Sequence, residues 1–171
     1  MTAALSTKLD DCAARFQRPE QLPQTKNICD AMPRRALVDA GPVVAFLSRA
    51  DQWHAWSVEQ FKHFTHFTTC EAVLAEACAR LAYYGQDQTK VVELVLEGAL
   101  VVDFTLAQVA DRVSRLMRKY KNRPMDLADA CLVAMTEKVS DSLVVTLDSR
   151  DFSIYRRHER EIVPFISPRK D

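Results

Sequence analysis

The pattern of hydrophobic and polar residues predicts short buried strands that alternate with amphipathic helices along most of the chain. Apolar runs without alternation indicate strands that are covered on both faces, as in a parallel sheet. Strands are expected at 36–38, 66–68, 99–104, 143–147 and 162–164. Helices are expected from about 41 to 47, near 53–63, 70–84, 88–97 and 106–120, and from about 126 onward. This alternation is typical of an α/β fold with right-handed crossovers.

Single residues mark the starts of two of these helices. Gly41 can take the unusual backbone angles of a tight turn after the first strand. Pro42 suits the first helical position, because the N–H that proline lacks would be unpaired there. Thr69 is expected to cap the helix at 70–84. These signals place both helices directly after strand ends.

Residues 1–35 differ from the rest of the chain and predict an N-terminal extension or linker. Apolar residues between Leu5 and Phe16 fall at helical spacing, and prolines then interrupt a polar segment. One folded domain is expected over 36–168. Two interpretations of the extension stay open: Met32 is the true start of the protein, or the upstream arm docks a partner.

Composition narrows the possible functions. Lysine plus arginine equals aspartate plus glutamate at 23 each, so any nucleic-acid site must be a local basic patch. The five scattered cysteines lack zinc-ligand spacing and predict reduced cytosolic thiols. The three glycines are too few and too far apart for a Gly-rich phosphate loop or a dinucleotide fingerprint. The sequence shows neither a signal peptide nor a membrane-spanning stretch, so we expect a cytoplasmic protein without a membrane partner.

Several carboxylates stand where an α/β fold brings side chains together. Asp39 and Asp148 follow two predicted strands, and ligands bind outside the carboxyl ends of the strands in such sheets. Glu76 lies on or beside the apolar stripe of its helix. Asp129 lies one turn inside an otherwise apolar helix, and Asp126 shares its face. We expect these side chains to share one pocket.

The same carboxylates also have structural explanations. Asp39 can simply cap the helix that follows it. Capping explains Asp126 well and Asp129 poorly, because Asp129 lies inside the helix. Glu76 can form a surface pair with Arg80, four residues further along the helix. The sequence leaves these alternatives open.

A pocket with four carboxylates requires compensation of its charge. Two unit charges ~4 Å apart repel by about 4 kcal/mol at an effective dielectric constant near 20. Either some carboxylates are protonated, with raised pKa values, or a divalent cation holds them. Oxygen ligands without nearby cysteine or histidine select Mg²⁺ or Mn²⁺ over zinc. Such a site suits phosphodiester hydrolysis, in which the metal activates water and stabilises the leaving oxygen.

The densest basic cluster lies in the predicted helix at 106–120. The residues considered for RNA binding are Arg112, Arg115, Arg118 and Lys119, together with Arg150. Arg156 and Arg157 are expected to form a second basic edge. The helix is either a solvated face or a phosphate-tracking flank of the pocket.

Four segments together carry a resemblance to a known family. They are Leu-Val-Asp39-Ala-Gly-Pro, Val-Leu-Ala-Glu76, Met-Asp126-Leu-Ala-Asp129-Ala and Val-Thr-Leu-Asp148-Ser-Arg-Asp-Phe. With these segments in this order over about 36–168, the chain resembles PIN-domain proteins, and most of all the VapC-like toxin ribonucleases. The resemblance implies a three-layer α/β domain with a central parallel five-stranded sheet flanked by helices.

The resemblance also implies an activity. By motif position, the acidic residues of the family pocket are matched by Asp39, Glu76, Asp129 and Asp148. Asp126 and Asp151 match less regular acidic neighbours. The family implies an endoribonuclease that uses Mg²⁺ or Mn²⁺, forms a homodimer and is neutralised by an antitoxin. Gly41-Pro42 replaces the polar residue often found after the first aspartate's turn, and the N-terminal extension departs from the compact toxin pattern.

Two other functions compete with the nuclease. A catalytically silent module of the same fold would bind RNA or protein and use the acidic pocket structurally. A phospho-acceptor receiver domain also gathers acids at strand ends, but it needs two adjacent acids on an early strand, where this chain offers only Asp39. The chain lacks a Ser-His or Cys-His pair at a recognisable spacing, which disfavours nucleophilic catalysis.

Overall fold

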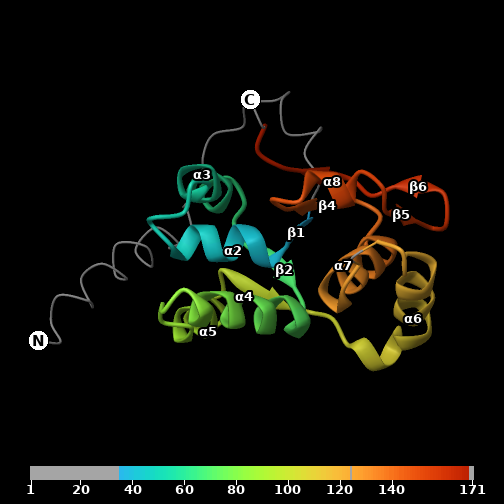
Figure 1. Cartoon of the computed structure of the whole chain (residues 1–171), viewed down its shortest axis with the longest axis horizontal. Helices are drawn as coiled ribbons and strands as arrows, with labels where there is room; N and C mark the ends of the chain where they lie inside the picture. Colours follow the sequence, from blue (N-terminus) through green and yellow to red (C-terminus); the bar gives the residue numbers. More distant parts are fainter. Residues whose placement is uncertain (1–34, 124, 170–171) are drawn as a thin grey trace, which may run out of the picture. The chain divides into compact units, whose positions relative to one another are not determined.

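Short apolar segments pair side by side as the parallel strands of one sheet (Figure 1). The computed structural model describes residues 35–123 and 125–169. The strands are β1 (Arg35–Val38), β2 (Phe67–Thr69), β3 (Leu100–Val102), β4 (Ser142–Val145) and β7 (Phe165–Ile166). They lie in the order β3-β2-β1-β4-β7, and each neighbouring pair is parallel. The predicted α/β fold with a central five-stranded parallel sheet is confirmed.

Helices connect the strands along the chain. After β1 come α2 (Ala40–Leu47) and α3 (His54–His63), and after β2 come α4 (Glu71–Tyr83) and α5 (Thr89–Leu96). After β3 come the 3₁₀ helix η3 (Leu106–Gln108), α6 (Ala110–Lys119) and α7 (Leu127–Lys138). Between β4 and β7 lie the single turn α8 (Ser149–Phe152) and the hairpin strands β5 (Arg156–Arg157) and β6 (Glu161–Ile162).

These connections create a topological switch point in the sheet. From β1 the chain moves to β2 and β3 on one side, and it then returns to β4 on the other side of β1. Because the crossovers are right-handed, the reversal places α2, α3, α4 and α5 on one face and α6 and α7 on the other (Figure 1). The carboxyl ends of β1 and β4 flank the switch point, where ligands bind in open α/β sheets.

Buried apolar side chains fill the space between the sheet and its helices. Val38 at the end of β1 and Val145 at the end of β4 are fully buried and lie opposite each other in register. Helix α7 buries every residue from Ala130 to Thr136. Burying each Val or Leu side chain contributes roughly 1.5–3 kcal/mol to the free energy of unfolding. The elements that border the switch point are therefore anchored by the core.

Three predicted strand boundaries are wrong. The strand expected at 99–104 is confined to β3, and the strand expected at 143–147 ends at Val145. The fifth parallel strand is β7 instead of 162–164, because the chain first turns into the β5–β6 hairpin. This tight turn holds His158 and Glu159 at positive φ (45° and 68°), which is uncommon for residues other than glycine. Hydrophobic periodicity cannot resolve strands of two residues.

Three local expectations are also corrected. Thr69 does not cap α4, because its hydroxyl donates a 3.1 Å hydrogen bond to the carbonyl of Val38, and Cys70 takes the N-cap position. Gly41 lies inside α2, where an added Cβ would be only 3.2 Å from Cγ of Leu147. Gly41 thus permits a close approach and does not provide an unusual turn. The helix expected at 106–120 is divided into η3 and α6.

The predicted N-terminal helix and most of the linker fall within 1–34, outside the described residues. Within the described part of the chain, Cys70, Cys78 and Cys131 are free thiols, as expected. Among the same residues, every helix is too short or too polar to cross a membrane.

Candidate active site

A cavity of about 480 Å³ lies at the switch point, beside the carboxyl ends of β1 and β4. Carboxylates dominate its lining, accompanied by two guanidinium groups and two residues without charge. The lining residues are Asp39, Gly41, Glu76, Arg80, Asp126, Asp129, Leu147, Asp148, Arg150 and Asp151. The structure therefore brings together all five carboxylates that the sequence singled out as candidate ligands, and it adds Asp151. We refer to this cavity as the acidic pocket.

Asp39 lies between the end of β1 and the start of α2. Its Oδ1 accepts a 2.7 Å hydrogen bond from the N–H of Ala40, and its Oδ2 accepts a 2.7 Å hydrogen bond from the hydroxyl of Thr146. Burial raises the pKa of the Asp39 carboxyl above its ordinary value, and the two hydrogen bonds oppose this shift. Asp39 therefore caps a helix and lines the acidic pocket at the same time.

Asp129 lies in the first turn of α7. Oδ1 of Asp126 accepts a 2.9 Å hydrogen bond from the N–H of Asp129, which confirms Asp126 as the helix cap. Oδ2 of Asp129 accepts a 3.0 Å hydrogen bond from the hydroxyl of Tyr155, whose side chain is fully buried. Burial, and then the negative charges of Asp126 and Asp39, raise the pKa of Asp129 to about 8. Asp129 can therefore hold a proton at neutral pH in the absence of a cation.

Glu76 reaches the acidic pocket from the flank of α4. Nη1 of Arg80 lies 3.5 Å from Oε1 of Glu76, so the expected i,i+4 pair forms while both residues line the pocket. Burial raises the pKa of Glu76, and the charges of Asp39 and Asp126 raise it further, against the opposing charge of Arg80. The carboxylates thus influence one another electrostatically across the pocket.

Asp148 occupies the N-cap of α8. Its Oδ1 accepts a 3.0 Å hydrogen bond from the N–H of Asp151. Burial and the charge of Asp148 raise the pKa of Asp151, opposed by Arg150 and Arg123. With Asp39 on α2 and Asp126 on α7, three carboxylates of the pocket cap three helices. The partial positive charge at each helix start stabilises the carboxylate that caps it.

The donor set of the acidic pocket fits a hard divalent cation. Carboxylate oxygens suit Mg²⁺ and Mn²⁺, and the described lining includes neither histidine nor cysteine. The raised pKa values reflect burial and repulsion that a bound cation would offset. Across residues 35–123 and 125–169, no three acidic, histidine or cysteine side chains stand close enough to form a ligand cluster as they are placed. Cation binding therefore requires the carboxylates to converge, against their mutual repulsion.

Comparison with protein families decides the assignment of this fold. The PIN domain model matches residues 36–157, which is more than half of the chain. The chain belongs to the PIN-domain family. No curated protein matches the chain significantly. The PIN domain is a nuclease-type fold, and PIN nucleases typically use divalent metal ions.

Two of the basic residues considered for RNA binding in this PIN domain belong to one ion-pair network. Arg112 donates hydrogen bonds of 2.8 and 2.6 Å to the two carboxylate oxygens of Glu137. Arg112 also contacts Glu159, whose Oε2 lies 3.2 Å from Nζ of Lys119. The side chains of Arg112 and Glu137 are only 15% and 13% exposed. This network joins α6, α7 and the turn between β5 and β6.

The other three candidates, Arg115, Arg118 and Arg150, are exposed. Arg150 lines the acidic pocket itself. Arg115 forms a surface pair with Asp111 at 2.9 Å, and Arg118 lines a separate, largely apolar cavity beside α6. Arg150 is thus the candidate that the structure places next to the carboxylates.

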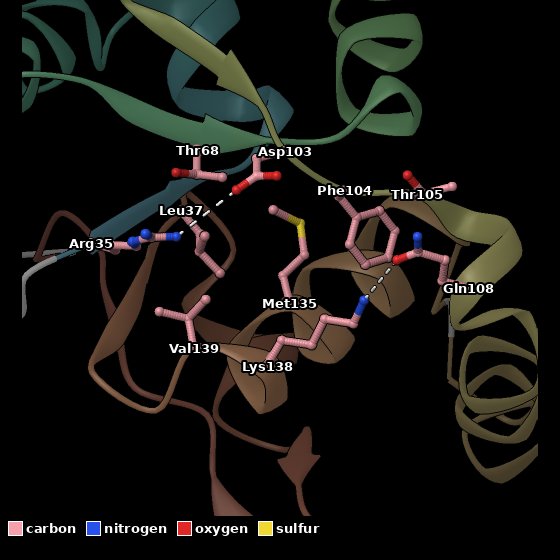
Figure 2. A pocket seen from close by; sticks show the side chains of 10 residues that line it. All are labelled: Arg35, Leu37, Thr68, Asp103, Phe104, Thr105, Gln108, Met135, Lys138 and Val139. Atoms are coloured by element: carbon pink, nitrogen blue, oxygen red, sulfur yellow. Dashed lines mark hydrogen bonds and ion pairs between the residues drawn. The ribbon is translucent and has the colours of Figure 1, made fainter.

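A second cavity, of about 300 Å³, lies between the sheet and α7, beside the start of β1 (Figure 2). Among the described residues that line it, Asp103 is the single carboxylate, and Nη1 of Arg35 lies 3.9 Å from it. Figure 2 also shows Lys138 directed toward Gln108, with a 3.5 Å hydrogen bond. Because a single carboxylate lines it, this cavity does not resemble a metal site.

Sequence analysis did not identify three residues that support or line the acidic pocket. Thr146 stands two residues before Asp148 in the matched Val-Thr-Leu-Asp segment, and that motif was a signal for it. Tyr155 carries no local signal, because its partner is 26 residues away in the sequence. Arg80 was identified as a partner of Glu76 but not as part of the pocket lining.

Proposed function

We propose that this PIN domain is an endoribonuclease that hydrolyses RNA phosphodiester bonds with Mg²⁺ or Mn²⁺ in the acidic pocket. The observation that supports the proposal is that six carboxylates line one pocket at the switch point. Burial and neighbouring negative charges raise the pKa values of several of them. A divalent cation neutralises the negative charge of such a pocket. PIN nucleases typically use divalent metal ions.

The proposed cation ligands are Asp39, Glu76, Asp129 and Asp148, with Asp126 beside them. When bound, the cation supplies Lewis-acid stabilisation of the negative charge that develops on the phosphate. Thr146 orients Asp39, and Tyr155 orients Asp129, through the hydrogen bonds described above. Water is the nucleophile, and a pocket carboxylate accepts its proton without a covalent enzyme intermediate.

Incubation of labelled RNA with the full chain tests this activity. Cleavage is expected with Mg²⁺ or Mn²⁺, and not with EDTA or with the Asp39→Asn variant. Metal-independent cleavage, or the absence of cleavage for every RNA tried, contradicts the proposal. If cleavage is absent and Mg²⁺ also leaves the melting temperature unchanged, the silent binding module is the better interpretation.

We propose further that the nuclease is the toxin of a toxin–antitoxin pair and acts as a homodimer. This part rests on the resemblance to VapC-like toxins. A cognate antitoxin would be encoded by a neighbouring reading frame. Co-purification with that product and loss of RNA cleavage in the complex are the expected results, whereas a neighbouring product that neither binds nor inhibits contradicts the toxin assignment.

A further inference from the structure

The face of α4 that carries Glu76 continues past the acidic pocket to exposed aromatic side chains. Helical residues are separated by 3.6 per turn and 1.5 Å along the axis, so Glu76, Arg80 and Tyr83 share one face. Tyr83 lies roughly 10 Å from Glu76 along this axis. Tyr83 is 85% exposed and the next residue, Tyr84, is 60% exposed. Packing within the described domain therefore does not account for either ring.

The end of α4 that bears these rings is well fixed. Gly85 has a φ of 66°, and the N–H groups of Gly85 and Gln86 return hydrogen bonds of 3.0 and 2.8 Å to carbonyls in the last turn of the helix. This is the Schellman arrangement, which closes a helix with a residue of positive φ. Nε2 of Gln86 donates a 2.7 Å hydrogen bond to Oγ of Ser48, at the C-cap of α2. The ring-bearing end is thereby tied to the helix whose other end carries Asp39.

Arg80 provides a cation between the carboxylates and the rings. Its ion pair to Glu76 uses one guanidinium nitrogen, and its side chain is 40% exposed. Arginine carries five N–H donors in a planar fork that matches a phosphate group. A phosphate next to the acidic pocket is therefore within reach of donors on the same helix face.

We propose that Arg80, Tyr83 and Tyr84 form a platform for single-stranded RNA beside the acidic pocket. The proposal rests on the proposed nuclease function and assigns three residues that hold a phosphate and unpaired bases of its RNA substrate. Arg80 contacts a phosphate, and a tyrosine ring stacks on a base. Every base offers a stacking face when it is unpaired, whereas a duplex hides these faces. The ring centroids are 5.4 Å apart with an interplanar angle of 75°, so the two rings present their faces in different directions.

We choose nucleic acid over a protein partner for this surface because of its surroundings. The rings follow directly from the acidic pocket along one helix, and the side chain between them and the pocket is a cation. A phosphate chain that enters the pocket passes such a surface, and its negative charge complements Arg80. A protein partner on the same surface is an outcome that the experiment below detects as unchanged RNA binding.

The test measures binding separately from cleavage. The full chain with Asp39→Asn serves as the parent, and fluorescence anisotropy follows a labelled RNA oligonucleotide, either single-stranded or annealed to its complement. The parent should prefer the single strand. Changing both Tyr83 and Tyr84 to Ala should weaken single-strand binding roughly tenfold and leave duplex binding unchanged. Changing both to Phe should preserve binding, because Phe retains the stacking face.

Matched controls separate stacking and charge from general surface effects. Leu96→Ala removes an 81% exposed apolar side chain from α5 and should leave binding unchanged. Arg80→Ala should reduce the salt dependence, as the slope of log K against log salt, by about 0.7 for a single strand. Arg160→Ala removes an exposed charge from the turn between β5 and β6 and should not change this slope.

Two results overturn the platform: single-strand binding by the double Ala variant that equals the parent, or a double Phe variant that binds as weakly as the Ala variant. Thermal melts confirm that each variant is folded. Failure of the nuclease proposal is distinguishable, because the unmodified chain would then bind single-stranded RNA through these residues without cutting it. Cleavage by the unmodified chain, together with unchanged single-strand binding by the double Ala variant, supports the nuclease and rejects the platform.

Discussion

The hydroxyl of Thr146 donates a 2.7 Å hydrogen bond to Oδ2 of Asp39 across the switch point. Oγ1 of Thr146 also accepts a 2.9 Å hydrogen bond from the N–H of Asp148. Thr146 is fully buried, so water does not compete for these bonds. One side chain therefore sets the relative position of the two aspartates at the ends of neighbouring strands.

Replacing Thr146 with Val should disturb the acidic pocket with little change in volume. The N–H of Asp148 and one oxygen of Asp39 lose a partner, which costs about 1–3 kcal/mol in the free energy of unfolding. The rise in melting temperature caused by Mg²⁺ should also shrink, because Asp39 is no longer oriented. Thr146→Ser keeps the hydroxyl and is the control. Thermal melts with Mg²⁺ and with EDTA measure both effects, and a Val variant with a full Mg²⁺ response would show that this bond does not organise the pocket.

Replacing Asp39 with Asn should separate a ligand role from a capping role. If the pocket carboxylates hold a cation, Mg²⁺ at a hundredfold excess over Kd should stabilise the unmodified protein by about 2.7 kcal/mol. The Asn variant should lose RNA cleavage and most of this stabilisation. In EDTA it should melt no lower than the unmodified protein, because a repulsive buried charge is gone while Asn still caps α2.

Two outcomes of the Asp39→Asn experiment would contradict these expectations. A variant that retains both cleavage and the Mg²⁺-dependent shift in melting temperature excludes Asp39 as a ligand. A variant that melts lower in EDTA by several degrees instead shows that the charged carboxylate supports the fold, through its bonds to Ala40 and Thr146.

The pKa of Asp129, raised to about 8, predicts how the metal-free protein responds to pH. In the unfolded chain an aspartate titrates near its ordinary pKa of about 3.9. The folded state therefore binds the proton more tightly, and stability falls as the pH rises between these two values. In EDTA the melting temperature should decrease from pH 6 to pH 8 and level off above about pH 9. For a chain of this size, a loss of ~1 kcal/mol corresponds to roughly 2–4 °C.

Two further melts identify Asp129 as the origin of this pH response. Asp129→Asn cannot ionise and should flatten the decrease between pH 6 and pH 8. The Mg²⁺-induced rise should grow over the same interval, because a carboxylate must lose its proton to bind a cation. A pH response in EDTA that is the same for the Asn variant assigns the titration to another group.

The sequence predicted the carboxylates of the acidic pocket better than the residues that hydrogen-bond to them. Asp39 and Asp148 were found because each follows a continuous apolar run, and the end of a buried parallel strand is a position set by local pattern. Glu76 and Asp129 were found because a carboxylate within an apolar helical stripe is costly without a partner. These arguments require only the local sequence around each residue.

The supporting residues depend on contacts that local pattern does not contain. Thr146 meets Asp39 across 107 residues of sequence, and Tyr155 meets Asp129 across 26. The fifth strand was misplaced because β5, β6 and β7 are two residues each, too short for a period of two to be visible. The ion pairs of Arg112 could not be predicted from the sequence either. Local pattern therefore did not distinguish this largely buried structural cation from its exposed neighbours on α6.

Arg112 and Arg115 should therefore respond differently to mutation although they are one turn apart. Arg112→Ala removes two of the three hydrogen bonds to the largely buried carboxylate of Glu137 and leaves only the one from the N–H of His158, which should lower the free energy of unfolding by about 3 kcal/mol. Arg115→Ala breaks an exposed pair with Asp111 and should cost less than about 1 kcal/mol. Urea unfolding with a two-state fit measures both values. Equal effects would mean that the Glu137 network contributes no more than a surface pair.

Mutations at exposed positions of α6 test whether this helix binds RNA. Of the two interpretations of this helix, a phosphate-tracking flank predicts that reversing Arg115 and Arg118 to Glu weakens binding of labelled RNA and reduces its salt dependence. The Mg²⁺-induced rise in melting temperature should not change, because neither residue lines the acidic pocket. Arg112 is unsuitable for this experiment, since its loss would confuse unfolding with binding. Unchanged RNA affinity in the folded double variant would assign Arg115 and Arg118 to a solvated face and leave Arg150, inside the pocket, as the phosphate contact among the five predicted basic residues.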